Sequence, residues 1–323
     1  MAARSHGFLR FGQFNIRDLT MEKLLDPENP QALAAAKIIK RFAPDVLSID
    51  EMEADPAAPA LFVENFLKKG EDPVDYPFSH IGQTNSGVPT GFPPPYDFRG
   101  YGRFRGQYGI ACLSRLKIVF EGIRNLKDIA WRAFPESYCE EVACPNDFPL
   151  WSNAFLDIPI ELKNGPIELK SGPVLHAILA HPTVPLRGYI NLRRNADQMK
   201  FLKSYADGLA EDKWGGPFVI MGDLNVDPDA GIGTNEVTKR LFEDGNIIYR
   251  KAGRKTFMEG GGLEPPLEEK PGMLVARLDY ILPSRGYFKM SGPEVFAPKG
   301  TPWWPVARRA SDHFFVYADC ELV

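Results

Sequence analysis

The feature that most constrains the fold is a series of short apolar runs of β type, separated by helical patterns and turn clusters. The first run, FLRFGQFNI, alternates apolar and polar residues as a strand with one buried face does. The predicted strands are 8–16, 45–51, 108–123 (one strand or a pair), 173–181, 217–223, 274–284 and 313–322. The predicted helices are 30–42, 57–70 and 193–212. This alternation is typical of a sheet-based α/β protein.

The organisation of the chain indicates one folding unit. Because no repeat and no linker divides it, we expect a single domain at 8–323 after a short N-terminal tail, 1–7, and a monomer. Residues 259–272 are rich in Gly, Pro and Glu and predict a mobile surface loop. Residues 82–107 mix Gly and Pro with Tyr, Phe and Arg, and long loops of this kind are uncommon in compact domains unless they are functional or disordered.

The charge balance argues against one class of partner. The chain has 323 residues, a net charge of −4 and a pI of about 5.8, so strong salt-driven binding to duplex nucleic acid is not expected from charge alone. No stretch approaches the ~18 consecutive apolar residues of a membrane-spanning helix. The N-terminus has no apolar stretch like a signal peptide, which leaves a cytosolic protein or one whose signal is not in this sequence.

The cysteines leave two alternatives open. Cys139 and Cys144 frame the sequence CEEVAC in an irregular region. They form either a short-loop disulfide, if the compartment is oxidising, or two unpaired thiols. The cysteine spacings resemble no zinc site.

Polar side chains mark the ends of the predicted strands. Binding groups gather at such places because the strands fix positions while the loops tolerate polar atoms. Any one of these residues alone is more often a cap or a satisfied core group. Together they are hard to explain as separate accidents, above all in the stretch GDLNVDPD at 222–229. The set is Asn15, Glu51, His181, Asp223, Asn225, Asp279, Asp312 and His313.

The chemistry of this set points to a hard cation. Oxygen ligands without a Cys/His cage suit Mg²⁺ first, with Mn²⁺ and Ca²⁺ as alternatives. Histidines that are not metal ligands can neutralise a phosphoryl group or protonate a leaving oxygen. A carboxylate beside an amide, as in Asp223 and Asn225, can orient and deprotonate an attacking water. The set therefore indicates metal-assisted phosphoester hydrolysis.

The order of several motifs resembles the endonuclease/exonuclease/phosphatase superfamily, which includes pancreatic deoxyribonuclease and inositol polyphosphate 5-phosphatases. GDxN followed by a late SDH is highly specific when both are present. The motifs are QFNI, APDVLSIDEME, YGIACLSR, LAHPTVP, IMGDLNVDP, RLDYILPS and ASDHFFVYADCEL. A closer resemblance, through TNSGVPTG, RRNADQ and RLDYILPSRG, is to a bacterial, often exported, phytase-like branch. That branch implies a secreted or periplasmic protein, with a cytoplasmic one as the alternative.

The resemblance implies a four-layer α/β sandwich, in which two mixed, mainly antiparallel sheets pack face to face between outer helices. It also implies roles for the strand-end residues. Glu51 resembles the principal metal ligand, with Asn15 and Asp312 in or beside the coordination shell. Asp223 resembles the residue that aligns or deprotonates the attacking water, and Asn225 the one that holds a phosphoryl oxygen.

The two histidines also have counterparts in the family. His313 resembles the histidine that contacts the scissile phosphate, and Asp279 the carboxylate that fixes its tautomer. His181 takes the place of a second histidine that stabilises the transition state or protonates the leaving group. One position departs from the pattern, because Asp50 precedes Glu51 where many relatives have Gln. Since side chains alternate along a strand, we expect Asp50 on the opposite face, at the core edge rather than on the metal.

Arginines near these residues are candidates for substrate binding. Each is expected either to hold an anionic part of the substrate or to lie on a solvated surface. They are Arg103 and Arg105 in the aromatic-rich loop at 82–107, and Arg187, Arg193 and Arg194 after His181.

Three functions fit the set. We expect a metal-dependent phosphatase or phosphodiesterase, acting on a small or lipid-like phosphoester that the acidic balance favours over nucleic acid. The alternative is a nuclease acting on DNA or RNA, for which the loop at 82–107 would have to supply the positive surface that the whole chain lacks. A non-catalytic binding module is the third possibility, and the complete set of strand-end residues argues against it.

Overall fold

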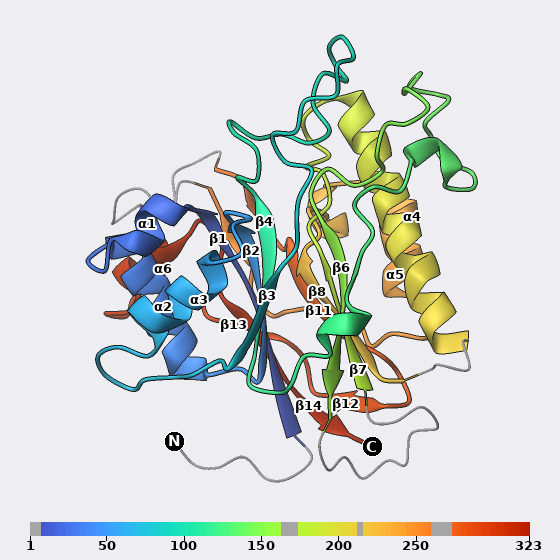
Figure 1. The fold of residues 1–323 in the computed structure, drawn as a ribbon. Coiled ribbons are helices and arrows are strands. Elements are labelled where there is room, and N and C mark those ends of the chain that lie inside the picture. Colours follow the sequence, from blue (N-terminus) through green and yellow to red (C-terminus); the bar gives the residue numbers. More distant parts are fainter. Residues whose placement is uncertain (1–7, 163–173, 212–215, 244, 260–272) are drawn as a thin grey trace.

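Two β-sheets pack face to face between two groups of helices (Figure 1). The computed structural model describes residues 8–162, 174–211, 216–243, 245–259 and 273–323. The predicted tail at 1–7 and, apart from Glu259, the predicted loop at 259–272 lie outside the described residues.

The first sheet has seven strands among the described residues, in the order β12-β14-β1-β2-β4-β3, with β13 also paired to β14. β1 and β2 run parallel, and the other pairs of this sheet are antiparallel. The strands are β1 (Phe8–Leu19), β2 (Val46–Met52), β3 (Phe78–Ile81), β4 (Gly109–Ser114), β12 (Phe288–Met290), β13 (Glu294–Val295) and β14 (Val316–Leu322).

The second sheet has five strands among the described residues, in the order β11-β8-β7-β6-β5. β7 and β8 run parallel, and the other pairs are antiparallel. The strands are β5 (Arg124–Asn125), β6 (Phe155–Glu161), β7 (Val174–Ala180), β8 (Phe218–Asp223) and β11 (Asp279–Pro283). A small two-stranded sheet pairs β9 (Phe257–Met258) with β10 (Val275–Ala276).

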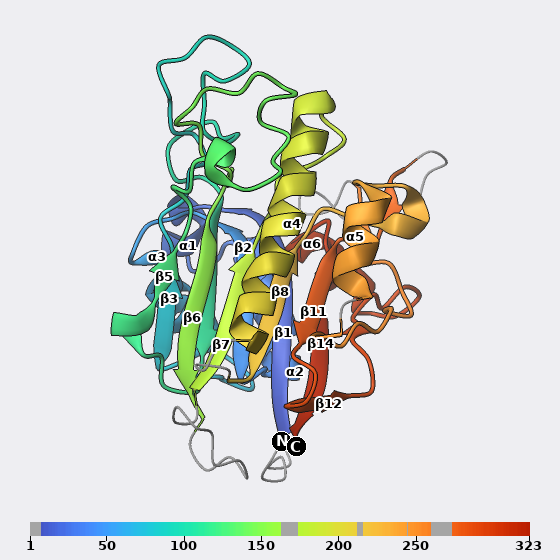
Figure 2. The ribbon, with the colours of Figure 1, turned by 90° about the vertical axis from the view of Figure 1, so that its right-hand side faces the viewer.

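Helices cover the outer face of each sheet (Figures 1 and 2). The first sheet carries α1 (Met21–Leu25), α2 (Pro30–Phe42), α3 (Ala58–Phe62), which continues into a π-helical turn, and α6 (Trp304–Ala310). The second carries α4 (Tyr189–Glu211) and α5 (Asn235–Phe242). One hydrophobic cluster fills each of the three spaces between layers. The predicted four-layer sandwich is confirmed. In the described part of the chain, no helix is long and apolar enough to span a membrane.

Two of the predicted strands are interrupted, for local reasons. The strand predicted at 108–123 stops at Ser114, because the Ser114 hydroxyl donates to the carbonyl of Leu116 and accepts from its N–H. The strand predicted at 274–284 is divided into β10 and β11. At the break, side chains take up the backbone donors, since Arg277 N donates to Asp227 Oδ2 and Leu278 N to Thr256 Oγ1, both at 2.8 Å.

Alternation along the strands decides which polar residues meet between the sheets. On β1, Phe11 lies in the inter-sheet core, while Phe14 packs under the helices. Gln13 therefore continues the inter-sheet face of Phe11 toward the end of the strand. Val219 and Met221 precede Asp223 on β8 in the same way. The space between the sheets thus changes from apolar at one end to polar at the other.

The close approach of β8 to β7 requires glycine at position 222. Gly222 has φ +159°, and a Cβ atom there would stand 1.9 Å from the carbonyl oxygen of Ala180. The two residues that follow these positions are His181 and Asp223, so the spacing of β7 and β8 also sets the spacing of two predicted site residues.

We predict that Gly222→Ala lowers the free energy of unfolding by about 1–3 kcal/mol, because the backbone must move to admit the methyl group. Urea denaturation measures the change. Gly208→Ala is the matched control, since Gly208 lies in α4 and a Cβ atom added to it would meet nothing within 4 Å, and it should gain about 0.5–1 kcal/mol from helix propensity. Equal stabilities of the Gly222→Ala protein and the wild type would contradict the packing argument.

Candidate active site

A cleft of about 810 Å³ opens where the polar strand ends meet. Six of the eight strand-end residues line it. Asn15 bonds to Glu51 and Asp223 among these six, and Asp279 to His313. The six are Glu51, His181, Asp223, Asn225, Asp312 and His313. The eight strand-end residues, which come from positions 15 to 313 of the chain, therefore form one cluster.

One carboxylate oxygen is the meeting point of this cluster. Asp223 Oδ2 accepts a hydrogen bond from Asn15 Nδ2 at 3.1 Å. The same oxygen lies 3.5 Å from His181 Nε2 and 3.6 Å from His313 Nε2. Asp223 is 2% exposed, and burial raises its pKa well above the ordinary value, while the charge of His313 opposes that rise. A carboxyl with a raised pKa is a better proton acceptor near neutral pH.

His313 is held by a buried carboxylate. Its Nδ1 lies 2.8 Å from Asp279 Oδ2, and this contact leaves Nε2 directed at the cleft. Burial alone would lower the pKa of His313, but Asp279 and Asp223 outweigh it and hold the pKa well above the ordinary value. The raised pKa favours the charged imidazolium form of His313.

His181 has the opposite protonation preference. Burial lowers its pKa, and the charge of Asp50 opposes this only in part. Its backbone carbonyl accepts from Asn153 Nδ2 at 3.0 Å, while its Nδ1 has no hydrogen-bond partner among the described residues. The two imidazoles beside Asp223 thus have pKa values shifted in opposite directions.

Asn225 follows the strand end in a left-handed backbone conformation, with φ +55°. Its N–H donates to Asp223 Oδ1 at 3.0 Å, and its side-chain amide donates to the carbonyl of Pro182. Left-handed backbone is costly for a residue other than glycine and persists where neighbours enforce it, often at functional sites. Here it turns the Asn225 amide toward the segment that carries His181.

Glu51 also has a left-handed backbone, with φ +64°. The pairing register of β2 shifts between Asp50 and Met52, so Glu51 leaves the regular alternation of the strand. Its carboxylate accepts from Asn15 Nδ2 at 3.1 Å and from the N–H of Asp18 at 3.2 Å. This bulge takes Glu51 out of the regular alternation that would place it on the face opposite Asp50.

Asp312 lies near Glu51 at the edge of the cleft. Its Oδ2 is 3.0 Å from Arg17 Nη1. Burial raises the pKa of Asp312 and Glu51 raises it further, while His313 and Arg17 lower it. The two carboxylates are therefore close enough for their charges to interact.

These donors fit a hard divalent cation. In the described part of the chain, no three His, Cys, Asp or Glu residues are grouped as a metal cage. Mg²⁺ needs no such cage, because it is usually held by one or two carboxylates and keeps its other positions for water and phosphate oxygens. Glu51 and Asp312 supply two. Asn15 lies beside Glu51, because its amide nitrogen donates to that carboxylate while its oxygen accepts from Arg17 N.

Asp50 lies under the cluster and is fully buried. Its Oδ2 accepts from Gln13 Nε2 at 2.7 Å and from the backbone N–H of Asp223 at 2.8 Å. Burial raises the pKa of Asp50 to about 6, and His181 opposes this rise. Asp50 therefore lies at the core edge and contacts the backbone of Asp223.

The arginine candidates divide into two groups. Arg103 and Arg187 line the cleft, with Arg103 paired to Asp18 at 2.5 Å and Arg187 over the ring of Tyr101 at 5.6 Å. The other three candidates lie differently. Among the described residues that line the cleft, Arg105 and Arg193 are not found, and Arg193 instead binds Glu141 at 2.7 Å.

Arg194 reaches the cleft but is 5% exposed, and its guanidinium is engaged elsewhere. It donates to the backbone carbonyls of Arg99, Pro149 and Leu150 at 2.7, 2.8 and 3.0 Å. These bonds fasten the loop at 82–107 to helix α4, so Arg194 is a structural residue rather than an anion ligand.

Several residues in or beneath the cleft were missed from the sequence. Gln13 lies two positions before Asn15 on the same face of β1, so strand periodicity could have found it. Asn153 lies just before β6, and it was missed because that strand was not predicted. Tyr108 and Lys23 line the cleft from a loop and a short helix, where the sequence carries no comparable signal.

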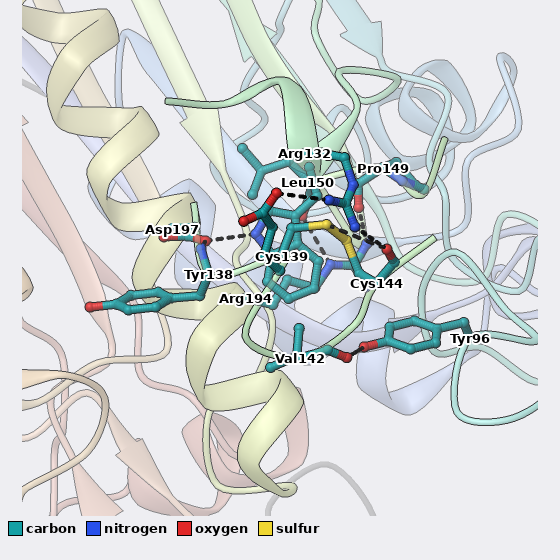
Figure 3. Close-up of a disulfide and its surroundings, with 12 residues drawn as sticks. Tyr96, Arg132, Tyr138, Cys139, Val142, Cys144, Pro149, Leu150, Arg194 and Asp197 are labelled. Carbon is teal, nitrogen blue, oxygen red and sulfur yellow. Dashed lines mark hydrogen bonds and ion pairs between the residues drawn. A yellow bond between two sulfur atoms is a disulfide. The ribbon is translucent and has the colours of Figure 1, made fainter. Parts of the chain in front are cut away.

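A disulfide closes a turn that lies between α4 and the loop at 82–107 (Figure 3). Of the two alternatives left open by the sequence, the structure has Cys139 and Cys144 joined. The turn that they close is bound on two sides, since Tyr138 N donates to Asp197 Oδ2 of α4 at 2.6 Å and Val142 O accepts from the Tyr96 hydroxyl.

Comparison with known proteins identifies the relatives of this chain. The model of the Endonuclease/Exonuclease/phosphatase family matches residues 12–313. A search of curated proteins found no match.

Solved structures share the fold at low sequence identity. An endonuclease/exonuclease/phosphatase from Beutenbergia cavernae DSM 12333 aligns with a TM-score of 0.59 and 17% identity, over 98% of this chain and 72% of that one. Truncated Caenorhabditis elegans TDP2 aligns with a TM-score of 0.56 and 14% identity, over 97% and 98%. The human Nocturnin catalytic domain aligns with a TM-score of 0.54 and 16% identity, over 99% and 97%.

We predict that Asp279→Asn destabilises the protein more at pH 6 than at pH 9. The folded pKa of His313 lies above its unfolded value, so the stability that its charge contributes is complete below about pH 6.5 and is lost as the pH rises through the folded pKa. Loss of the bond to the charged ring should cost about 1.5–3 kcal/mol at pH 6. Urea denaturation at both pH values measures this.

Asp128→Asn is the control for charge removal alone. Asp128 pairs with Arg99 on the surface, so its replacement should change stability by less than about 1 kcal/mol at either pH. The same loss for Asp279→Asn at pH 6 and pH 9 would contradict the assignment of His313 as charged.

Proposed function

The chain belongs to the endonuclease/exonuclease/phosphatase family, and we propose that it hydrolyses a phosphoester in the cleft between Glu51 and His313. The proposed cofactor is a divalent cation, Mg²⁺ before Mn²⁺ or Ca²⁺. The observation that carries the proposal is the convergence of Asn15, His181 and His313 on one oxygen of Asp223. A buried carboxylate ringed by donors is suited to hold and deprotonate a water.

Asp223 would act on the nucleophile. Its two oxygens have different surroundings, because Oδ1 accepts from Asn225 N while Oδ2 faces the two imidazoles. The carboxylate is therefore fixed in orientation, and its raised pKa suits it to accept the proton of an attacking water. The Asn15 amide donates to both Asp223 and Glu51. It would therefore fix the position of the carboxylate that activates the water relative to the carboxylate that binds the cation.

The histidines would stabilise the charge that develops on the phosphoryl group. His313, kept charged by Asp279, would donate from Nε2 to a phosphoryl oxygen. His181, neutral near pH 7, would bind a second oxygen or pass a proton to the leaving group. A cation held by Glu51 and Asp312 would supply Lewis-acid stabilisation of the same charge.

The charges of the cleft favour a small or lipid-like phosphoester. Arg17 faces Asp312, and Arg103 faces Asp18. Lys23 donates to the carbonyl of Asp18 and to Gln31. Two of these three cations are paired with carboxylates, and Glu51, Asp223 and Glu259 also line the cleft. The cleft is therefore not an unbroken positive groove of the kind that a polyanion needs. A nuclease is the second candidate, favoured by Arg187 and the stacked rings of Tyr101 and Tyr108.

We predict that a chelator abolishes release of nitrophenol from bis(4-nitrophenyl) phosphate and 4-nitrophenyl phosphate, and that added Mg²⁺ restores it. The ratio of the two rates distinguishes a diesterase from a monoesterase, and a parallel plasmid-nicking assay tests the nuclease. Full activity after removal of all divalent metal would contradict the proposed role of Glu51 and Asp312. Nicking without nitrophenol release would favour the nuclease.

We predict that His313→Ala lowers kcat by about 10²–10⁴-fold, because the charged donor to the phosphoryl group is lost. The assay is nitrophenol release at saturating substrate and Mg²⁺. His80→Gln is the control, since His80 lies on β3 and is not among the residues that line the cleft, and it should leave kcat unchanged. Wild-type kcat in the folded His313→Ala protein would rule out the assigned role.

A further inference from the structure

A second cavity of about 400 Å³ adjoins the cleft, and the proposed mechanism does not use it. The two cavities share Tyr101, Asn191 and Arg194 in their linings. The second is otherwise lined mainly by the loop at 82–107, by Phe148 and by Ile190 at the start of α4. In Figure 1 this loop stands beside the N-terminal end of α4. A ligand anchored in the cleft could therefore extend into this neighbouring cavity.

Aromatic side chains dominate the walls of this second cavity. Tyr96 and Phe148 meet edge to face with their ring centroids 5.0 Å apart, and Phe98 lines the opening with 46% of its surface exposed. Tyr101, at the junction with the cleft, is 68% exposed. Such rings bind the faces and edges of other rings, whereas they offer little to a plain phosphate.

The one cation in the described lining of the second cavity does not make it an anion site. Arg194 gives its hydrogen bonds to three backbone carbonyls, and its guanidinium carbon lies 4.7 Å from the centroid of the Phe148 ring. Its flat face is therefore part of an aromatic stack. The polar side chains in the lining are Asp97 and Asn191, which suit the polar edge of a ring better than a second anion.

The walls are fixed before any ligand arrives (Figure 3). The Tyr96 hydroxyl donates to the carbonyl of Val142, in the turn closed by the Cys139–Cys144 disulfide. Arg194 ties Pro149 and Leu150 to α4 in the same region. A pocket that is already ordered binds a ring without the entropic cost of assembling its own walls.

We propose that the second cavity is a subsite for an aromatic ring carried by the substrate, several bonds away from the phosphate bound in the cleft. The ligand class is a phosphodiester whose non-leaving group ends in a planar ring. This inference rests on the proposed function and names the substrate class of the same site.

The test uses phosphodiesters with one leaving group and different second groups. The substrates are the methyl, hexyl and 4-phenylbutyl esters of 4-nitrophenyl phosphate, assayed with Mg²⁺. Because the leaving group is constant, differences in kcat/KM report binding of the second group. We expect the phenylbutyl ester to exceed the hexyl ester by about 3- to 10-fold, the size of an aromatic pairing gain. A thymidine 5′-ester distinguishes a nucleobase from a plain aryl ring, and a gain for either supports the subsite.

Phe98→Ala should reduce the phenylbutyl preference to less than about 2-fold and leave the methyl ester unchanged, because Phe98 lines only the second cavity. Phe92→Ala is the matched control. Phe92 is an exposed ring of the same loop and is not among the residues that line either cavity. Equal kcat/KM for hexyl and phenylbutyl esters in the wild type would overturn the subsite while leaving the proposed function intact.

If no ester is hydrolysed, the proposed function is contradicted, but the subsite can still be tested by a binding measurement. Calorimetry compares 4-phenylbutylphosphonate with hexylphosphonate in the presence of Mg²⁺. Tighter binding of the aryl phosphonate, by about 3- to 10-fold in the wild type and Phe92→Ala but not in Phe98→Ala, supports the subsite. Equal binding of the two phosphonates by the wild type overturns it.

Discussion

A buried carboxylate joins the two sheets at the end where the cleft forms. Asp50 of β2 accepts from Gln13 in its own sheet and from the backbone N–H of Asp223 in the other. A hydrogen bond between a buried charged group and a backbone donor is costly to lose, because the carboxylate would remain away from water without a partner. This contact therefore fixes the distance between the strand that carries Glu51 and the strand that carries Asp223.

The same end of the sandwich carries an unusual amount of left-handed backbone. Arg17, Asp18, Glu51 and Asn225 all have positive φ, and all four line the cleft. Each such residue costs on the order of 1–3 kcal/mol and needs support from its surroundings. The support is visible, since Glu51 accepts from Asp18 N and Asn225 N donates to Asp223. In this conformation the four residues leave the regular strand alternation, and they line the same cleft.

Strand ends and loops contribute different parts of the site. The sheet ends supply the groups that would act on a phosphoryl group. His181, Asp223 and His313 among them are buried, whereas Glu51 and Asp312 are partly exposed to the cleft. The loop at 82–107, the disulfide turn and the start of α4 supply the wall beside them, with Arg194 as the fastening between these segments. A rigid base and a wall of loops allow one chemistry to be combined with different substrates. The wall is therefore where substrate choice in this chain should be sought.

The sequence determined the strand-end residues, because a strand has a period of two and a polar residue after an apolar run is visible without any knowledge of its neighbours. It determined the family through the order of its motifs, above all GDxN and the late SDH. It also anticipated that Asp50 and Glu51 differ in surroundings. It did not determine that β2 bulges between Asp50 and Met52, that Arg193 pairs with Glu141 while Arg194 binds three carbonyls, or that Cys139 and Cys144 are joined. These depend on contacts between segments far apart in the chain. Only the packed tertiary structure decides which partner each side chain meets. Burial then decides how much free energy a polar side chain loses if it has no hydrogen-bond partner.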